Sequence, residues 1–285
     1  MPGFCNMPSS IFNLVDSHCH IQSAEGFEGE ASTRKMWEKA GETSPEDIIA
    51  RAKTADVTKM ICVGCTLEDS LLAVNVARSH ENCWASIGVH PHEAHHYVHG
   101  LAAIKEFAAL ATAPKVVAVG ECGLDYFYEH SDRASQQRIL EFQLELAIKR
   151  NLPVIFHVRE AFDDFWPIFE KYSSRRKPTR GVLHSFTDSL ENLDRALRHG
   201  LYIGVNGIAT FTKKPEQLEV YKAIPLASLL LETDAPFLTP VPFRGKICEP
   251  YHIRTIAEYL AELRGESLEK LAEATTRNAQ QLFNI

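Results

Sequence analysis

The feature that most constrains the fold is a repeated alternation of short apolar runs with segments of helical pattern. The runs are rich in aliphatic and β-branched residues, and they cover residues 14–16, 60–64, 84–89, 116–120, 153–157, 182–184, 202–205 and 229–232. They are apolar throughout, which is typical of parallel strands that are buried on both faces. Eight such strands that alternate with helices predict either a (β/α)8 barrel or a doubly wound sheet.

The segment after the first strand favours the barrel. A dinucleotide-binding doubly wound sheet needs a glycine-rich turn at this point, whereas this chain has Ser17-His18-Cys19-His20. We therefore expect one α/β domain over residues 1–285, with its core at about 14–283. Residues 21–44 are a long loop for a barrel, and two helices are expected at the C-terminus, over about 250–263 and 267–283.

Charge and cysteine content exclude several classes of protein. The net charge of −7 argues against a broad basic surface for nucleic acid. Seven cysteines without framework spacing, and no leader or membrane-spanning run, predict a cytoplasmic protein without a disulfide scaffold or membrane partner. Cys62 and Cys65 form a single C-x-x-C, which is either a redox or zinc pair or simple packing; the lack of a second such pair favours packing. No feature indicates an obligate protein partner, and the oligomeric state is left open.

Imidazoles and carboxylates recur at the ends of the predicted strands. They are His18, His20, His90, His92, Glu121, Asp125, His157, His184 and Asp234. Each is unremarkable alone, because a single histidine is often an interior hydrogen-bonding residue and an aspartate often caps a helix. In a barrel, however, these strand ends meet at one face, where a cluster of buried polar groups is costly unless it binds a divalent metal. The pattern therefore predicts a metal centre.

Eight short motifs in this order resemble the TatD-type metal-dependent deoxyribonucleases. They are DSHCH at 16–20, GVHP at 88–91, GECGLDY at 120–126, HVRE at 157–160, HSF at 184–186, GVNG at 204–207, ETDAP at 232–236 and RGK at 244–246. The resemblance covers about residues 14–283 and implies a TIM barrel of the amidohydrolase-like group.

The resemblance also implies two divalent metal ions, which could be zinc, magnesium or manganese. His18, His20, Glu121 and Asp234 would hold one ion, and Glu121, His157 and His184 would hold the other, with Glu121 as the bridge. These six residues are all among the strand-end residues identified independently above.

The implied activity is hydrolysis of phosphodiester bonds at the ends of single-stranded DNA by a water that the two metals activate. Asp234 and Glu121 are the catalytic candidates, and Asp234 is expected to orient the water and manage its proton. Arg159, Arg244 and Lys246 are candidate phosphate contacts, although surface ion pairs with Glu160 or Glu249 are an equal alternative. Two metal ions would make the mouth positive in an acidic protein.

Two alternatives to a nuclease stay open. The first is an amide or ester hydrolase of the amidohydrolase group, such as an aminoacyl-tRNA deacylase; such enzymes often bridge their metals with a modified lysine where this chain has Glu121. The second is a non-catalytic scaffold, which has no need of six intact ligands. The chain departs from the family pattern at Cys248, where asparagine is usual, and in the expanded 21–44 connection. Both departures are expected to affect substrate choice.

Overall fold

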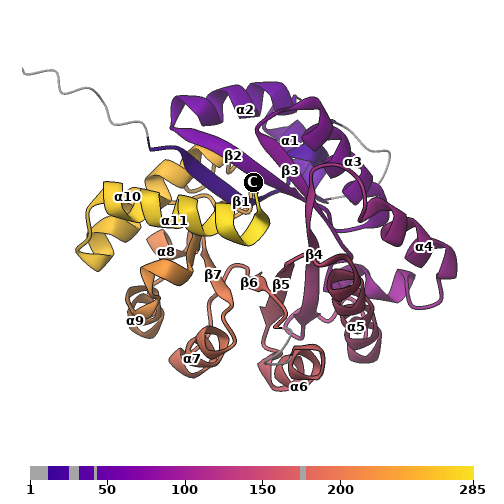
Figure 1. Ribbon diagram of the computed structural model, residues 1–285. Coiled ribbons are helices and arrows are strands. Elements are labelled where there is room, and N and C mark those ends of the chain that lie inside the picture. The colour runs from indigo at the N-terminus through magenta and orange to yellow at the C-terminus, as the bar shows by residue number, and fades with distance from the viewer. Residues whose placement is uncertain (1–11, 26–31, 42–43, 174–177) are drawn as a thin grey trace, which may run out of the picture.

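The computed structural model describes residues 12–25, 32–41, 44–173 and 178–285. Eight parallel strands form one sheet in which each strand pairs with the next along the chain. The strands are β1 (Leu14–Cys19), β2 (Val57–Val63), β3 (Cys83–Ile87), β4 (Val116–Asp125), β5 (Val154–Arg159), β6 (Gly181–Leu183), β7 (Tyr202–Val205) and β8 (Leu229–Leu231). Figure 1 shows the strands at the centre with helices around them.

The sheet curls until its first and last strands meet. The Ser17 hydroxyl donates to the carbonyl of Leu231 at 2.9 Å, and the His20 amide donates to the carbonyl of Ala235 at 2.8 Å. Cys19 also forms a bridge to Ala235. These contacts confirm the predicted (β/α)8 barrel and exclude the doubly wound sheet, which is open at both edges.

Helices cover the outside of the barrel (Figure 1). Within the described residues they are α1 (Ser32–Lys39), α2 (Pro45–Thr54), α3 (Leu67–Ser79), α4 (Leu101–Leu110), α5 (Arg133–Arg150), α6 (Phe162–Tyr172), α7 (Leu190–Arg198), α8 (Ile208–Phe211), α9 (Pro215–Ala223), α10 (Ile253–Arg264) and α11 (Leu268–Phe283), with short 3-10 turns η1 (Ile21–Glu25), η2 (Pro91–His96), η3 (Leu226–Ser228) and η4 (Pro250–His252). No helix among these residues is long and apolar enough to cross a membrane.

The hydrophobic core has two parts. The larger part lies between the strands and the surrounding helices. The smaller part fills the barrel with side chains such as Val15, Ile61 and Ile155, and Leu282 and Phe283 of α11 pack against it. Asn278 of α11 donates to carbonyls at the start of β8. Helix α11 therefore closes the amino-terminal end of the barrel, which leaves the carboxyl-terminal end for the polar residues.

The long connection after β1 contains structure that its sequence did not predict. It includes η1 and helix α1, while residues 26–31 and 42–43 lie outside the described part. Trp37 of α1 is fully buried, and its indole nitrogen donates to the carbonyl of His20 at 3.1 Å. The connection is thus attached to the strand end that carries two of the predicted ligands.

Strand β4 extends further than its apolar run predicts. Residues 121–125 looked like the start of a loop, because Glu121, Gly123 and Asp125 interrupt the apolar pattern. In the structure they pair with β5, for example Cys122 with Phe156. Gly120 permits this, because a side chain there would overlap the Ile155 carbonyl of β5. Glu121 and Asp125 therefore lie within a rigid strand.

Candidate metal centre

The six predicted ligands all lie at the carboxyl-terminal end of the barrel. They come from β1 (His18, with His20 directly after it), β4 (Glu121), β5 (His157), the end of β6 (His184) and the loop after β8 (Asp234). His157 and Asp234 are half-buried, and the other four are buried, with His18 only 1% exposed. Four groups of potential metal ligands occur among the described residues, and three of them consist of these side chains and His90.

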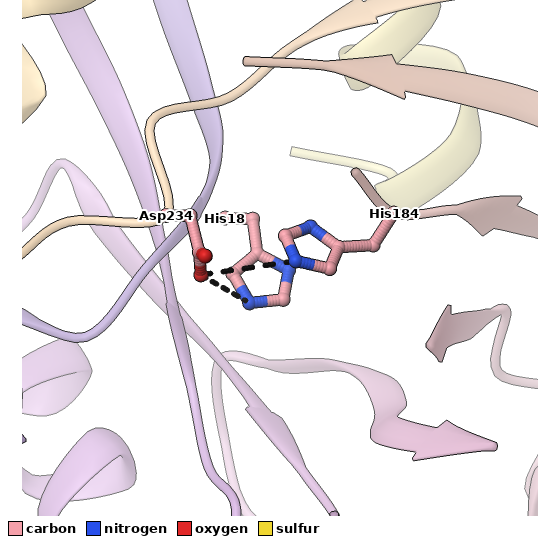
Figure 2. Close-up of side chains that lie close together, drawn as sticks. All are labelled: His18, His184 and Asp234. Atoms are coloured by element: carbon pink, nitrogen blue, oxygen red, sulfur yellow. Dashed lines mark ion pairs between the residues drawn. The ribbon is translucent and has the colours of Figure 1, made fainter. Parts of the chain in front are cut away.

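The first group gathers around Asp234. Its Oδ1 lies 3.6 Å from the Nε2 atom of His18 and 3.3 Å from that of His20, and the two Nε2 atoms are 3.2 Å apart. His184 lies on the same side of Asp234 as His18, with its Nε2 3.7 Å from the same Oδ1 (Figure 2). The rings of His18 and His184 stack with their centroids 3.6 Å apart. Nitrogen atoms that converge in this way repel one another unless a cation or proton lies between them.

The second group gathers around Glu121, whose two oxygens face different sets of imidazoles. Its Oε2 lies 3.3 Å from His18 Nε2. Its Oε1 lies 2.8 Å from His157 Nδ1, 3.6 Å from His90 Nε2 and 3.8 Å from His184 Nε2. A carboxylate placed between two sets of nitrogen donors fits a bridging position between two cations.

Outer contacts set the direction of three rings. The second nitrogen of each ring contacts an acceptor: His20 Nδ1 lies 2.8 Å from the Val63 carbonyl, His184 Nδ1 lies 2.9 Å from Glu232, and His157 Nε2 lies 2.9 Å from Asp125. An acceptor on one nitrogen places the proton there and directs the lone pair of the other nitrogen into the cluster. The chemistry of the donor set therefore fits divalent metal binding.

The cluster shifts the ionisation of its own members. Burial opposes the charged form of Glu121, but the surrounding imidazoles of His90, His18 and His184 hold its pKa well below the ordinary value. Burial likewise opposes the charged form of His184, but the carboxylates of Glu232 and Glu121 raise its pKa to about 9. Burial instead lowers the pKa of His18 and His90. The site thus holds an ionised Glu121 next to imidazoles of both kinds, of which His184 keeps a proton when no metal replaces it.

Asp234 has an unusual backbone conformation. Its φ angle is 63°, in the left-handed region, and its amide donates to the carbonyl of His18 at 2.9 Å. A non-glycine residue in this region costs about 1–3 kcal/mol and tends to occur at functional sites. Here the conformation turns the carboxylate back toward His18 and His20.

The three predicted phosphate contacts are exposed and have no acidic partner in the described part of the chain, so the predicted ion pairs are not formed there. The Arg159 guanidinium, at the end of β5, lies 4.0 Å from the ring centroid of Phe127. The Arg244 guanidinium lies 4.0 Å from the Phe211 centroid and donates to the Thr239 carbonyl. Lys246 follows in the same loop. Of the three, Arg159 is the one that pairs with Asp125 of the site, in the register of β4 and β5.

Several site residues were not predicted as ligands or as their supports. His90 contacts Glu121, and its position after the third strand was the available signal. Glu232 supports His184, and its position at the end of the eighth apolar run was the available signal. The Cys65 thiol lies 3.9 Å from Glu121 Oε2, whereas Cys62 is buried in β2. Packing therefore accounts for Cys62 but not for Cys65.

Cys248, the departure from the family pattern, is fully buried. Its thiol lies 3.8 Å from His252 Nδ1. It therefore does not face solvent.

A barrel with imidazoles and carboxylates clustered at its carboxyl-terminal end defines the class of metal-dependent hydrolases. The chain belongs to one family of this class: the family described as TatD related DNase matches residues 15–284.

Relatives with this fold are similar over most of their length. The chain is 36% identical to the "Uncharacterized metal-dependent hydrolase YabD" of Bacillus subtilis, covering 95% of this chain and 99% of the relative. It is 36% identical to the "3'-5' ssDNA/RNA exonuclease TatD" of Escherichia coli, covering 84% of this chain and 93% of the relative. The crystal structure of YjjV, a TatD homolog from E. coli, superposes with a TM-score of 0.83 at 30% identity and covers 97% of this chain and 100% of YjjV.

Proposed function

We propose that this metal-dependent hydrolase is a nuclease that cleaves phosphodiester bonds at the ends of single-stranded DNA. The observation that carries the proposal is Glu121, whose two oxygens face separate sets of imidazoles. Such a bridge suits a pair of cations, which is the usual arrangement for in-line displacement at phosphorus. The relative named as a single-strand exonuclease supports the same substrate class.

The side chains present would hold two ions. His18, His20, Asp234 and Glu121 would hold one, and Glu121, His157 and His184 the other. Zinc, manganese and magnesium are all compatible with these ligands. The ions would supply positive charge for the phosphodiester and acidify a bound water.

The residues of the chain have separate roles in this proposal. Asp234 orients the attacking water and accepts its proton, because it is a carboxylate at the edge of the cluster with a side chain 16% exposed. Glu121 would bridge the two ions, with one carboxylate oxygen toward each set of imidazoles. Asp125 and Glu232 prevent rotation of the His157 and His184 rings. Arg159 binds a phosphate of the substrate, because it is exposed and carries no acidic partner among the described residues.

The experiment that tests this function compares substrates with each metal. We expect purified protein loaded with magnesium, manganese or zinc to degrade end-labelled single-stranded DNA, and to leave a cyclic amide and an aminoacyl-tRNA intact. Hydrolysis of the amide or the aminoacyl ester in place of DNA would show that the protein is one of the alternative hydrolases. A protein inactive on all three substrates with every metal would contradict the proposal.

The substitution Asp234→Asn tests the assigned role directly. We expect kcat on single-stranded DNA to fall by about 10²- to 10⁴-fold, because the amide cannot accept a proton. The far-UV circular dichroism spectrum should not change. Asp194→Asn, at an exposed acid of α7, is the matched control and should behave like the wild type. Turnover close to wild type in Asp234→Asn would refute the role.

A further inference from the structure

Two consecutive aromatic side chains are exposed directly after β4. Phe127 is 50% exposed and Tyr128 is 52% exposed, and they are the only aromatic residues among the large exposed hydrophobic side chains of the described part. Their ring centroids lie 4.7 Å apart. Exposed aromatic faces of this kind provide a large contact area at low entropic cost.

The turn that carries these rings is fixed to the metal centre. Oδ1 of Asp125 accepts hydrogen bonds from the amides of Phe127 and Tyr128, both at 3.0 Å. Oδ2 of the same carboxylate lies 2.9 Å from Nε2 of the ligand His157. One buried side chain therefore sets the positions of both the aromatic pair and a metal ligand.

A cation lies over the aromatic pair. The Arg159 guanidinium is 4.0 Å from the Phe127 centroid and 4.7 Å from the Tyr128 centroid. No acidic residue of the described chain pairs with it, so its hydrogen-bond donors are available to an anion. Arg159 also lines a cavity of about 250 Å³ together with Lys214 and the two acids Glu160 and Asp188. The lining carries both signs of charge, so the positive group that the structure places at the aromatic pair is Arg159 itself.

We propose that Phe127 and Tyr128 form a stacking subsite for an unpaired nucleobase near the scissile bond, with Arg159 on a phosphate of the same strand. The proposal rests on the proposed nuclease function and specifies how that site selects its substrate. Aromatic rings stack on any base, and a guanidinium binds phosphate through two donors, so the subsite does not discriminate between bases. Bases inside a duplex have both faces covered, so the subsite favours unpaired ends.

The test uses a variant that removes both rings and a substrate that removes the base. We expect Phe127→Ala/Tyr128→Ala to raise the KM for single-stranded DNA roughly 5- to 150-fold, the range typical of lost base stacking. On an oligonucleotide whose terminal residues are abasic, the wild type should show a similarly raised KM, because there is no base to stack. On this substrate the KM of the double substitution should exceed that of the wild type by less than about twofold. The single substitution Tyr128→Phe keeps the ring and should therefore keep the wild-type KM.

Controls separate this proposal from the function on which it rests. Leu190→Ala removes an exposed apolar side chain at the start of α7 and should leave the KM unchanged. An unchanged melting temperature in each variant excludes unfolding as the cause. If the wild type cleaves single-stranded DNA but the double substitution does not change its KM, the subsite is refuted and the nuclease function stands. If the wild type cleaves no single-stranded DNA, both proposals are refuted.

Discussion

At the scale of single residues, the site depends on how each imidazole is oriented. A ring that could rotate would offer its proton as often as its lone pair to the cluster. Glu232 prevents this for His184, and it fits because residue 204 is glycine: a side chain there would overlap the Glu232 carboxylate. Asn206 of the same motif donates to Glu232 at 3.3 Å, so the motif supports the site through Glu232.

Replacement of Glu232 tests this support. We expect Glu232→Gln to weaken metal binding by about 10- to 100-fold, because the amide no longer holds the proton on His184 Nδ1. Titration of the metal-free protein with zinc in competition with a chelator measures the effect. Glu216→Gln, at an exposed position in the first turn of α9, is the matched control. Unchanged zinc affinity in Glu232→Gln would show that the contact does not position the ring.

His252 gives the protein a predictable dependence on pH. Burial lowers the pKa of its side chain to about 4 from 6.5, so the folded protein keeps it neutral. The unfolded chain binds a proton below pH 6.5 that the folded chain does not. This contribution to stability is complete above pH 6.5 and is lost as the pH falls toward 4, by about 3 kcal/mol in total.

Urea unfolding at several pH values measures this loss, with a chelator present throughout so that metal release does not contribute. We expect the free energy of unfolding of His252→Asn to fall less steeply between pH 6.5 and 4 than that of the wild type. His96→Asn, at an exposed histidine, should keep the wild-type slope. Parallel slopes for His252→Asn and the wild type would contradict the assignment.

At the scale of elements, the strands and the two C-terminal helices could be predicted from local pattern. Apolar runs marked all eight strands, and the helices expected over about 250–263 and 267–283 are α10 and α11. The end of β4 could not be predicted in this way. Its polar residues are buried by strand neighbours that are distant in the sequence, and no local pattern reports them.

Helix α1 shows what the long connection contributes. Trp37 is buried and holds the backbone at His20, so we expect Trp37→Ala to cost about 3–5 kcal/mol in unfolding free energy and to weaken metal binding. Trp84 is only partly buried, between Lys59 and Lys115, so Trp84→Ala should cost less and leave metal affinity unchanged. Chemical denaturation and zinc titration measure both effects. Equal destabilisation by the two substitutions would contradict this ranking.

At the scale of the whole molecule, the net charge of −7 restricts how the proposed DNA substrate can bind. Near the site, the exposed cations without an acidic partner among the described residues include Arg159, Arg244 and Lys246, and bound metal ions would add positive charge. We expect weak, metal-dependent binding of single-stranded DNA whose log affinity falls with log salt at a slope of about −2, as for two or three phosphate contacts. Fluorescence anisotropy with a hydrolysis-resistant oligonucleotide measures the slope. Tight binding without metal, or a slope several times steeper, would indicate a broad basic surface instead.

The sequence by itself determined the number and order of the strands and the end of the barrel that carries the chemistry. It could do so because a run of apolar residues marks a buried strand, and because the polar residues that follow each run mark the strand's carboxyl-terminal end. Only the tertiary structure decided that Glu121 faces two sets of imidazoles, that His90 joins them, and that Arg159 lies over Phe127. These relations depend on distances between strands that are far apart along the chain, and such distances are set only when the barrel closes.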